Sequence, residues 1–296
     1  MRIVSLVPSA TEMLFALGLG DELIAVTHEC DYPPDALELP KVTRNVLPDD
    51  LSSAEIDAAV KQRTLAGESI YELDAGLLHD LQPDLIVTQG LCEVCAVSFD
   101  EVRALAEELA SQPQVVSLDP TTVGEVLGDA RTLAQATDRR EAAVAVVRTA
   151  AERIDRVRLK VRGARRIQVA ALEWLDPPFA AGHWTPQLIE FAGGEDVLGF
   201  PGEHSRQCSW AEVQAARPDV VVVMPCGYDA QLAHREAEMH REELAAVGAG
   251  EVVAVDAAAY FSRPGPRIID GIELLAHILH PELVESAPGE AFSVEL

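Results

Sequence analysis

Two short stretches of the chain, one in each half, carry the same pattern in the same order. Residues 83–88 and 218–223 each begin with a Pro-Asp pair and continue as a short apolar run, and Cys92 and Cys226 follow shortly after. Such a run after a turn is typical of a buried strand in a parallel sheet. Ligands of open α/β sheets bind outside the carboxyl ends of the strands. The repeat therefore predicts two similar lobes that face one cleft, with a thiol at each lobe's ligand edge.

Strands and helices are expected to alternate along the whole chain, which indicates βα units and parallel sheets. The expected strands lie near residues 2–7, 22–27, 84–88, 114–118, 166–172, 220–223 and 252–255. Ser9 is expected to cap the first helix, with Glu12 three residues later as in a capping box. Further helices are expected to open at Ser52, to follow Cys95, and to cover residues 186–192, 210–216, 229–246 and 264–279.

The middle of the chain differs from both halves. From Thr121 to Val161 there is no proline and there are only two glycines, Gly124 and Gly128, and apolar residues recur at helical spacing. We expect two helical segments, the second of about 24 residues and about 36 Å long at 1.5 Å per residue, the length of a strut between lobes. The predicted fold is α/β: two Rossmann-like lobes, at 1–120 and 164–296, joined by a long rigid helical backbone at 121–163.

The net charge of −26 excludes two classes of partner. A field of this sign repels phosphate backbones and anionic membrane surfaces, so we expect no nucleic-acid partner. The basic stretch from Arg153 to Arg166 is interpreted as a solvated face near a helix C-terminus, where the helix dipole favours cations. No apolar run approaches the length of a membrane span.

The start of the chain leads directly from Met1 into a predicted strand, without a recognisable secretory signal. Five cysteines, an odd number, do not match a disulfide framework. These features predict a cytoplasmic location, with a periplasmic or surface-anchored location only if a leader had been trimmed.

Two polar clusters could bind a metal ion. His28 and Cys30 follow a predicted strand, and imidazole and thiolate are ligands for zinc or another soft metal. Cys92 and Cys95 form a C-x-x-C pair between a strand and a helix, which could clamp a metal, act as a redox pair, or be two small buried side chains. Cys226 is a weaker candidate ligand from the second half.

A set of aromatic residues gathers in the second half and could wall a ligand pocket or belong to the core. Its members are Trp174, Phe179, Trp184, Trp210, Tyr228, Tyr260 and Phe261. The sequence contains no nucleophile elbow, P-loop, zinc-protease motif or dinucleotide fingerprint, so hydrolase and nucleotide-dependent functions are disfavoured.

Motifs spread over nearly the whole chain resemble the helical-backbone (class III) substrate-binding proteins of ABC importers, nearest the vitamin B12-binding ones. They comprise residues 5–12 with 16–18, 31–34, 83–86, 177–179, Gly182, 193–195 and 266–269. The resemblance implies two α/β lobes joined by one long helix, with the ligand in the cleft. It also implies that Tyr32, Phe179 and Arg263 lie near a corrin.

We therefore expect a non-enzymatic protein that holds a cobalamin-like tetrapyrrole or a metal complex, with an ABC permease as partner if it is exported. The ligand-binding candidates are Ser9, Tyr32, Trp174, Phe179, Trp184, Tyr228 and Arg263. The alternative is a cytosolic thiol-dependent enzyme or redox or metal-handling protein that uses Cys92 and Cys95, with His28 or Glu29 as proton acceptor.

Overall fold

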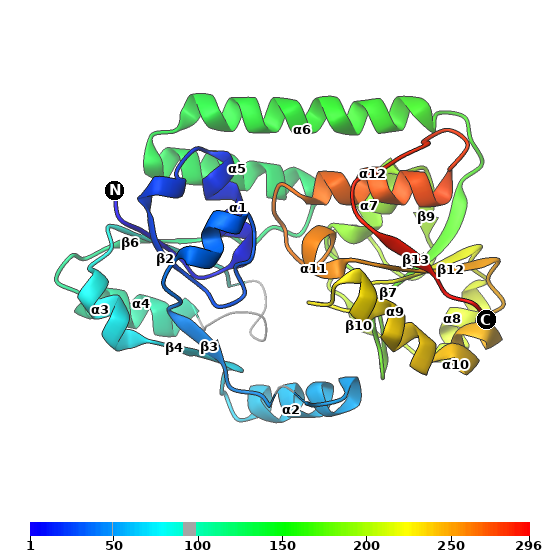
Figure 1. Cartoon of the computed structure of the whole chain (residues 1–296), viewed down its shortest axis with the longest axis horizontal. Helices are drawn as coiled ribbons and strands as arrows, with labels where there is room; N and C mark the ends of the chain where they lie inside the picture. The colour runs from blue at the N-terminus through cyan, green and yellow to red at the C-terminus, as the bar shows by residue number, and fades with distance from the viewer. Residues whose placement is uncertain (49, 91–98) are drawn as a thin grey trace. The chain divides into compact units, whose positions relative to one another are not determined.

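The computed structural model describes residues 1–48, 50–90 and 99–296. Its elements alternate between strand and helix, as the sequence predicts, and the α/β class is confirmed (Figure 1). Two compact units can be distinguished: unit 1 comprises residues 1–120 and 127–147, and unit 2 comprises residues 121–126 and 148–296. The predicted domain boundaries stay a prediction.

Unit 1 is built on a parallel four-stranded sheet in the order β2-β1-β5-β6. Its strands are β1 (Ile3–Ser5), β2 (Leu23–Val26), β5 (Leu85–Thr88) and β6 (Gln114–Ser117). A separate antiparallel pair consists of β3 (Thr43–Asn45) and β4 (Tyr71–Leu73). The helices are α1 (Pro8–Ala16), α2 (Ser53–Leu65), α3 (Ala75–Leu81) and α4 (Phe99–Glu108), with 3-10 turns at η1 (Gly20–Glu22) and η2 (Pro34–Glu38). Helix α5 (Val123–Thr137) belongs to unit 1 from residue 127 onwards.

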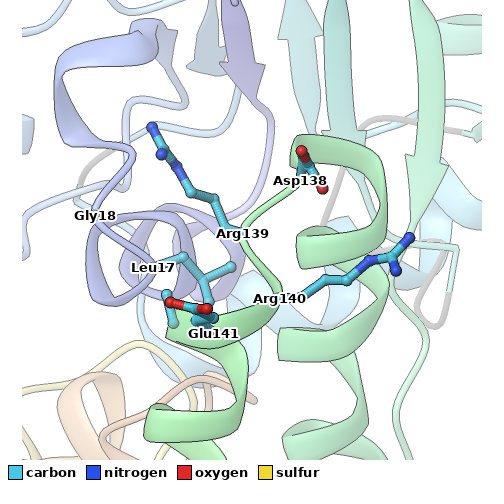
Figure 2. A pocket seen from close by; sticks show the side chains of 7 residues that line it. Leu17, Gly18, Asp138, Arg139, Arg140 and Glu141 are labelled. Carbon is cyan, nitrogen blue, oxygen red and sulfur yellow. The ribbon is translucent and has the colours of Figure 1, made fainter.

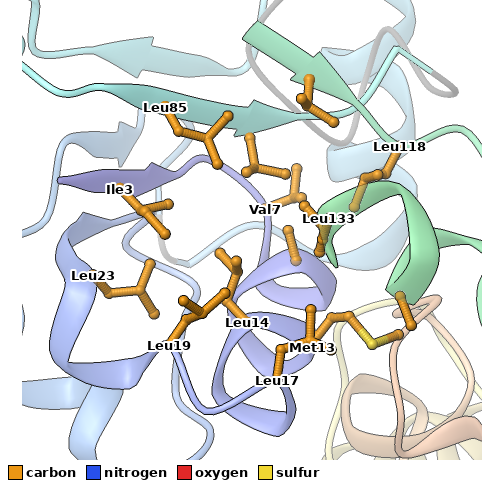
Figure 3. Close-up of a cluster of buried hydrophobic side chains, with 14 of the residues drawn as sticks. Ile3, Val7, Met13, Leu14, Leu17, Leu19, Leu23, Leu85, Leu118 and Leu133 are labelled. Atoms are coloured by element: carbon orange, nitrogen blue, oxygen red, sulfur yellow. The ribbon is translucent and has the colours of Figure 1, made fainter. Parts of the chain in front are cut away.

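Both faces of the unit 1 sheet are buried. Side chains alternate between the faces of a strand, so Ile3 belongs to a core cluster with α1 and α5 (Figure 3), whereas Val4 packs with α3 and α4. A parallel sheet needs such cover on both sides, which explains the near-continuous apolar runs in its strands.

Unit 2 contains a seven-stranded mixed sheet in the order β10-β8-β7-β11-β12-β13, with β9 paired to β7. Its strands are β7 (Ile167–Leu175), β8 (Pro178–Ala180), β9 (Gly194–Asp196), β10 (Arg206–Gln207), β11 (Val220–Val223), β12 (Glu251–Val255) and β13 (Ala291–Ser293). Its helices are α7 (Thr185–Phe191), α8 (Trp210–Ala216), α9 (Ala230–Met239), α10 (Arg241–Val247), α11 (Ala257–Tyr260) and α12 (Ile268–Leu279).

The predicted pair of central helices is present as α5 and α6 (Arg140–Lys160), separated at Asp138, whose φ of 57° is left-handed (Figure 1). At 21 residues α6 is about 32 Å long at 1.5 Å per residue. Among the described residues, no helix combines the length and the apolar character needed to cross a bilayer.

Three local expectations were wrong. Ser9 does not cap α1: the N-cap is Val7, and Pro8 takes the first helical position, where its fixed φ fits and its missing N–H costs nothing. The helix expected at 229–246 is two helices that meet at His240. The β3–β4 pair was not predicted, because strands of three residues are too short to show periodicity.

Candidate ligand-binding site

The carboxyl edge of the unit 2 sheet carries several of the aromatic residues that the sequence singled out. Strands β7, β11 and β12 are parallel and in register, so the segments that follow them leave the sheet at the same edge. Trp174 lies near the end of β7, and Tyr228 follows β11. This is the edge at which open α/β sheets bind ligands.

Trp174 and Tyr228 form the centre of this cluster. Their ring centroids lie 5.7 Å apart at an interplanar angle of 67°, an edge-to-face arrangement that aromatic pairs prefer. The indole N–H of Trp174 donates to the backbone carbonyl of Asp176 at 3.2 Å. Phe179 stands opposite Trp174 in the β7–β8 pairing. All three aromatic side chains are partly exposed, and we call Trp174, Phe179 and Tyr228 the aromatic cluster.

Backbone contacts hold the loops around the aromatic cluster in place. The carbonyl of Tyr228 accepts from the N–H of Ala258 at 3.0 Å, and the N–H of Gly227 donates to Ser262 Oγ at 3.3 Å. The segments after β11 and β12 are therefore tied together.

Trp184 is buried beneath the 261–263 loop and is not part of the exposed aromatic surface. It is only 6% exposed, and its indole N–H donates to the carbonyl of Phe261 at 2.8 Å. A buried indole that satisfies its donor in this way fixes the 261–263 loop, so a direct ligand contact by Trp184 stays a prediction.

Arg263 lies partly buried in the loop that Trp184 supports. Its positive charge interacts electrostatically with Asp256. Asp256 caps α11 by accepting a hydrogen bond from the Ala259 N–H at 2.7 Å. Burial raises the pKa of Asp256, and the Ala259 hydrogen bond and the charges of Arg267 and Arg263 oppose that rise. The edge therefore carries cationic side chains close to the aromatic cluster's loops.

His28 lies at the carboxyl end of β2 in unit 1, where the β3–β4 pair holds it. Its Nδ1 is 2.7 Å from Thr43 Oγ1, and its ring lies 5.1 Å from that of Tyr71. Burial lowers the pKa of His28, with a smaller opposing effect from Glu29. The hydroxyl of Tyr71 donates to Glu29 at 2.7 Å. Thr43 and Tyr71 were not among the predicted site residues.

The three cysteines among the described residues have different surroundings. Cys30 is 1% exposed within the apolar core, and its sulfur lies 3.0 Å from Thr11 Oγ1. Cys208 is buried and Cys226 exposed. Cys92 and Cys95 lie outside the described residues. Within residues 1–48, 50–90 and 99–296, no group of three or more His, Cys, Asp or Glu side chains is placed to hold a metal, so the predicted metal site stays a prediction.

Ser9 and Tyr32 complete the predicted ligand contacts. Ser9 is buried as the second residue of α1. Tyr32 precedes the cis-proline Pro33 and is 45% exposed. The Tyr32 side chain is therefore accessible to solvent, whereas Ser9 is not.

A hollow of about 560 Å³ lies at the junction of α5 and α6 in unit 1, and none of the predicted ligand contacts lines it (Figure 2). It is lined by Leu17, Gly18 and residues 138–142. Arg139 is paired there with Glu22 at 2.8 Å, and the charged side chains of Asp138, Arg140 and Glu141 also line the hollow. This mixed lining does not single out a class of ligand.

Known proteins resemble the chain over nearly its whole length. It is 26% identical over 278 residues to a vitamin B12-binding protein of Vibrio cholerae serotype O1, covering 92% of this chain and 86% of that protein. It is 26% identical over 295 residues to a vitamin B12-binding protein of Pectobacterium carotovorum, covering 98% and 91%.

Solved structures share the fold. A periplasmic vitamin B12-binding protein of Vibrio cholerae matches with a TM-score of 0.67 at 23% identity, over 94% of this chain and 96% of that one. A periplasmic haem-binding protein of Pseudomonas aeruginosa matches with a TM-score of 0.71 at 17% identity, over 100% and 98%. The predicted class III fold is confirmed.

These findings decide two open points. The predicted cytoplasmic location is wrong, because the family and the structural neighbours are periplasmic binding proteins. The alternative of a thiol-dependent enzyme is not supported, because the relatives bind solutes and are not enzymes. A model of the periplasmic binding protein family matches residues 3–259, and the chain belongs to that family.

Proposed function

We propose that this protein binds a cobalamin-like tetrapyrrole and delivers it to an ABC permease. The observation that carries the proposal is the aromatic cluster at the carboxyl edge of the unit 2 sheet, with Trp174 and Tyr228 in edge-to-face contact. The vitamin B12-binding relatives, at 26% identity over 92% and 98% of the chain, favour a corrin over haem.

The chemistry of the edge suits such a ligand. A corrin presents broad apolar faces and a rim of amide groups, and partly exposed indole, phenyl and phenol rings offer flat apolar surface with few rotatable bonds. Arg263, held in a loop that Trp184 supports, can donate to carbonyl oxygens on the rim. Contributions from Ser9 and Tyr32, which belong to unit 1, stay a prediction.

The test is a titration of the purified protein with cyanocobalamin, followed by calorimetry and by the visible spectrum of the ligand. We expect Trp174→Ala and Tyr228→Ala each to raise Kd at least about tenfold, which is about 1.4 kcal/mol of binding free energy.

Phe200→Ala is the matched control, since Phe200 is an aromatic residue of the same unit that is 64% exposed. It should leave Kd unchanged. Equal affinities for wild type, Trp174→Ala and Tyr228→Ala would contradict the proposal, as would binding of haemin with no binding of cyanocobalamin.

A further inference from the structure

His183 and His204 meet outside the aromatic cluster. His183 lies between β8 and α7, and His204 precedes β10. Nε2 of His183 is 3.1 Å from Nδ1 of His204, and the two rings are nearly perpendicular, with centroids 5.0 Å apart. Neither residue was singled out by the sequence.

The separation of the two nitrogens suits a shared metal ion. At a bond length of about 2.0–2.1 Å, two imidazole nitrogens on one ion lie about 2.9 Å apart at a right angle and about 3.3 Å apart in a tetrahedron. The observed 3.1 Å lies between these values. Both rings would have to turn away from the line between the two nitrogens to direct their lone pairs at a common centre.

The backbone around the pair is closely packed. The N–H of His183 donates to the carbonyl of Glu203 at 2.6 Å, and the N–H of Gly202 donates to the carbonyl of His183 at 2.9 Å. A Cβ at Gly182 would collide with backbone atoms of Glu203, His204 and Ser205. The two loops can approach this closely only because residue 182 has no side chain.

His183 itself has a left-handed backbone with a φ of 52°. This conformation is uncommon for a residue other than glycine, and such local strain is concentrated at functional sites. The tight loop contacts therefore hold a strained residue whose ring is directed at a second imidazole.

The other ring nitrogen of His183 has a hydroxyl neighbour. Nδ1 lies 3.4 Å from Ser205 Oγ, and an Nδ1–H that donates to this oxygen leaves Nε2 with a free lone pair. Such outer hydrogen bonds orient metal-binding histidines. Burial, and then the neighbouring His204, lower the pKa of His183, which favours the neutral ring that metals bind.

We propose that His183 and His204 chelate one borderline divalent transition-metal ion, such as Ni²⁺ or Zn²⁺. In the bound state both rings are neutral, with the proton of His183 on Nδ1 and that of His204 on Nε2, and any proton that lay between the two facing nitrogens is released to solvent. Among the described residues no third His, Cys, Asp or Glu completes the group, so water fills the remaining positions. The proposed site uses none of the predicted thiol ligands.

The test uses Ni²⁺ and Zn²⁺ alone, so its outcome is independent of the proposed tetrapyrrole. All variants carry Cys92→Ser and Cys95→Ser, so that thiols do not contribute. We expect one ion bound per chain by calorimetry, and paramagnetic broadening by Ni²⁺ of the imidazole NMR signals of both histidines. His183→Asn and His204→Ala should each weaken binding at least about tenfold; asparagine is chosen because it tolerates the left-handed backbone.

His79→Ala is the matched control, because His79 is a histidine of unit 1 whose side chain is 68% exposed. It should retain the affinity of the parent protein. Unfolding curves of each variant confirm that the fold is intact. The proposal is overturned if the parent protein binds neither ion, or if His183→Asn and His204→Ala bind Ni²⁺ as tightly as the parent.

Discussion

Asp196 lies at the end of β9 with its carboxyl group almost fully enclosed by protein. Its Oδ1 accepts from the N–H groups of Leu198 and Gly199, both at 2.9 Å. Its Oδ2 is buried and has no hydrogen-bond partner among the residues that the structure describes. Burial raises the pKa of Asp196 to about 6, against the smaller opposing effect of the two N–H groups.

A raised pKa makes this residue a source of pH-dependent stability. The folded state binds the proton more tightly than the unfolded state, whose pKa is close to 3.8. The free energy of unfolding therefore falls as the pH rises from about 4 to about 6. Asp196→Asn should remove this loss, which amounts to about 3 kcal/mol for a rise of this size.

Urea unfolding at pH 4.5 and pH 7.5 measures the larger part of this effect, about 2 kcal/mol, as the difference between wild type and Asp196→Asn, because pH 4.5 already lies above the unfolded pKa. Asp219→Asn is the control of opposite sign, since the Gln168 N–H and Arg165 lower the pKa of Asp219. It should lose stability mainly at the higher pH. Parallel pH profiles for wild type and Asp196→Asn would show that the carboxyl group does not titrate as described.

At the scale of single elements, a serine caps a helix only when it stands at the N-cap position, directly before the first helical residue. Ser209 caps α8: its Oγ accepts from the Glu212 N–H, and the Glu212 carboxylate accepts from the Ser209 N–H, a full capping box. Ser9 and Glu12 have the same spacing, but Pro8 moves the start of α1 forward and no cap bond forms. A serine followed by a glutamate three residues later therefore forms a capping box only when the serine is the N-cap residue.

The two serines make a matched pair for mutation. Ser209→Ala should lower the free energy of unfolding by about 1 kcal/mol, the usual effect of losing an N-cap. Ser9→Ala removes no cap bond and should cost less. Thermal unfolding of both variants measures which of them loses more stability. A larger loss for Ser9→Ala than for Ser209→Ala would contradict the assignment of Val7 as the N-cap of α1.

Across the whole molecule, electrostatics is dominated by an excess of acidic groups, 49 against 23 basic ones. Several of the few cations are already paired. Arg153 donates to both Asp270 and Glu273 at 2.5–2.9 Å, and Arg165 donates to Asp219 at 2.9 Å. The basic stretch is therefore neutralised partly within unit 2, consistent with its interpretation as a structural face.

A net charge of −26 implies self-repulsion in the folded state. Raising the NaCl concentration from about 10 mM to about 150 mM shortens the Debye length from about 30 Å to about 8 Å and screens this repulsion. We expect Tm to rise over this range, measured by scanning calorimetry. Potassium chloride at the same ionic strength should raise Tm by the same amount, because screening depends on ionic strength and not on the identity of the cation. A fall in Tm would show that paired charges such as Arg153 outweigh the repulsion.

Much of the architecture could be predicted because its signals are local. The Pro-Asp turns at 83–84 and 218–219 preceded β5 and β11 as expected. The helical periodicity of residues 121–161 appeared as α5 and α6. By contrast, β3 and β4 carry no readable period, and β7 extends to Leu175 and includes Trp174, beyond the strand expected at 166–172. Pairing with β8 lengthens that strand, and pairing partners are not visible in a local window.

The sequence by itself determined the alternation of strands and helices and the family, because turns, periodicity and motifs act over a few neighbouring residues. Only the tertiary structure decided which side chains meet. Cys30 packs against Thr11, Trp184 bonds to Phe261, and His183 lies against His204. These contacts join segments 19 to 77 residues apart, and the packing of whole elements, not local preference, sets which way such side chains point.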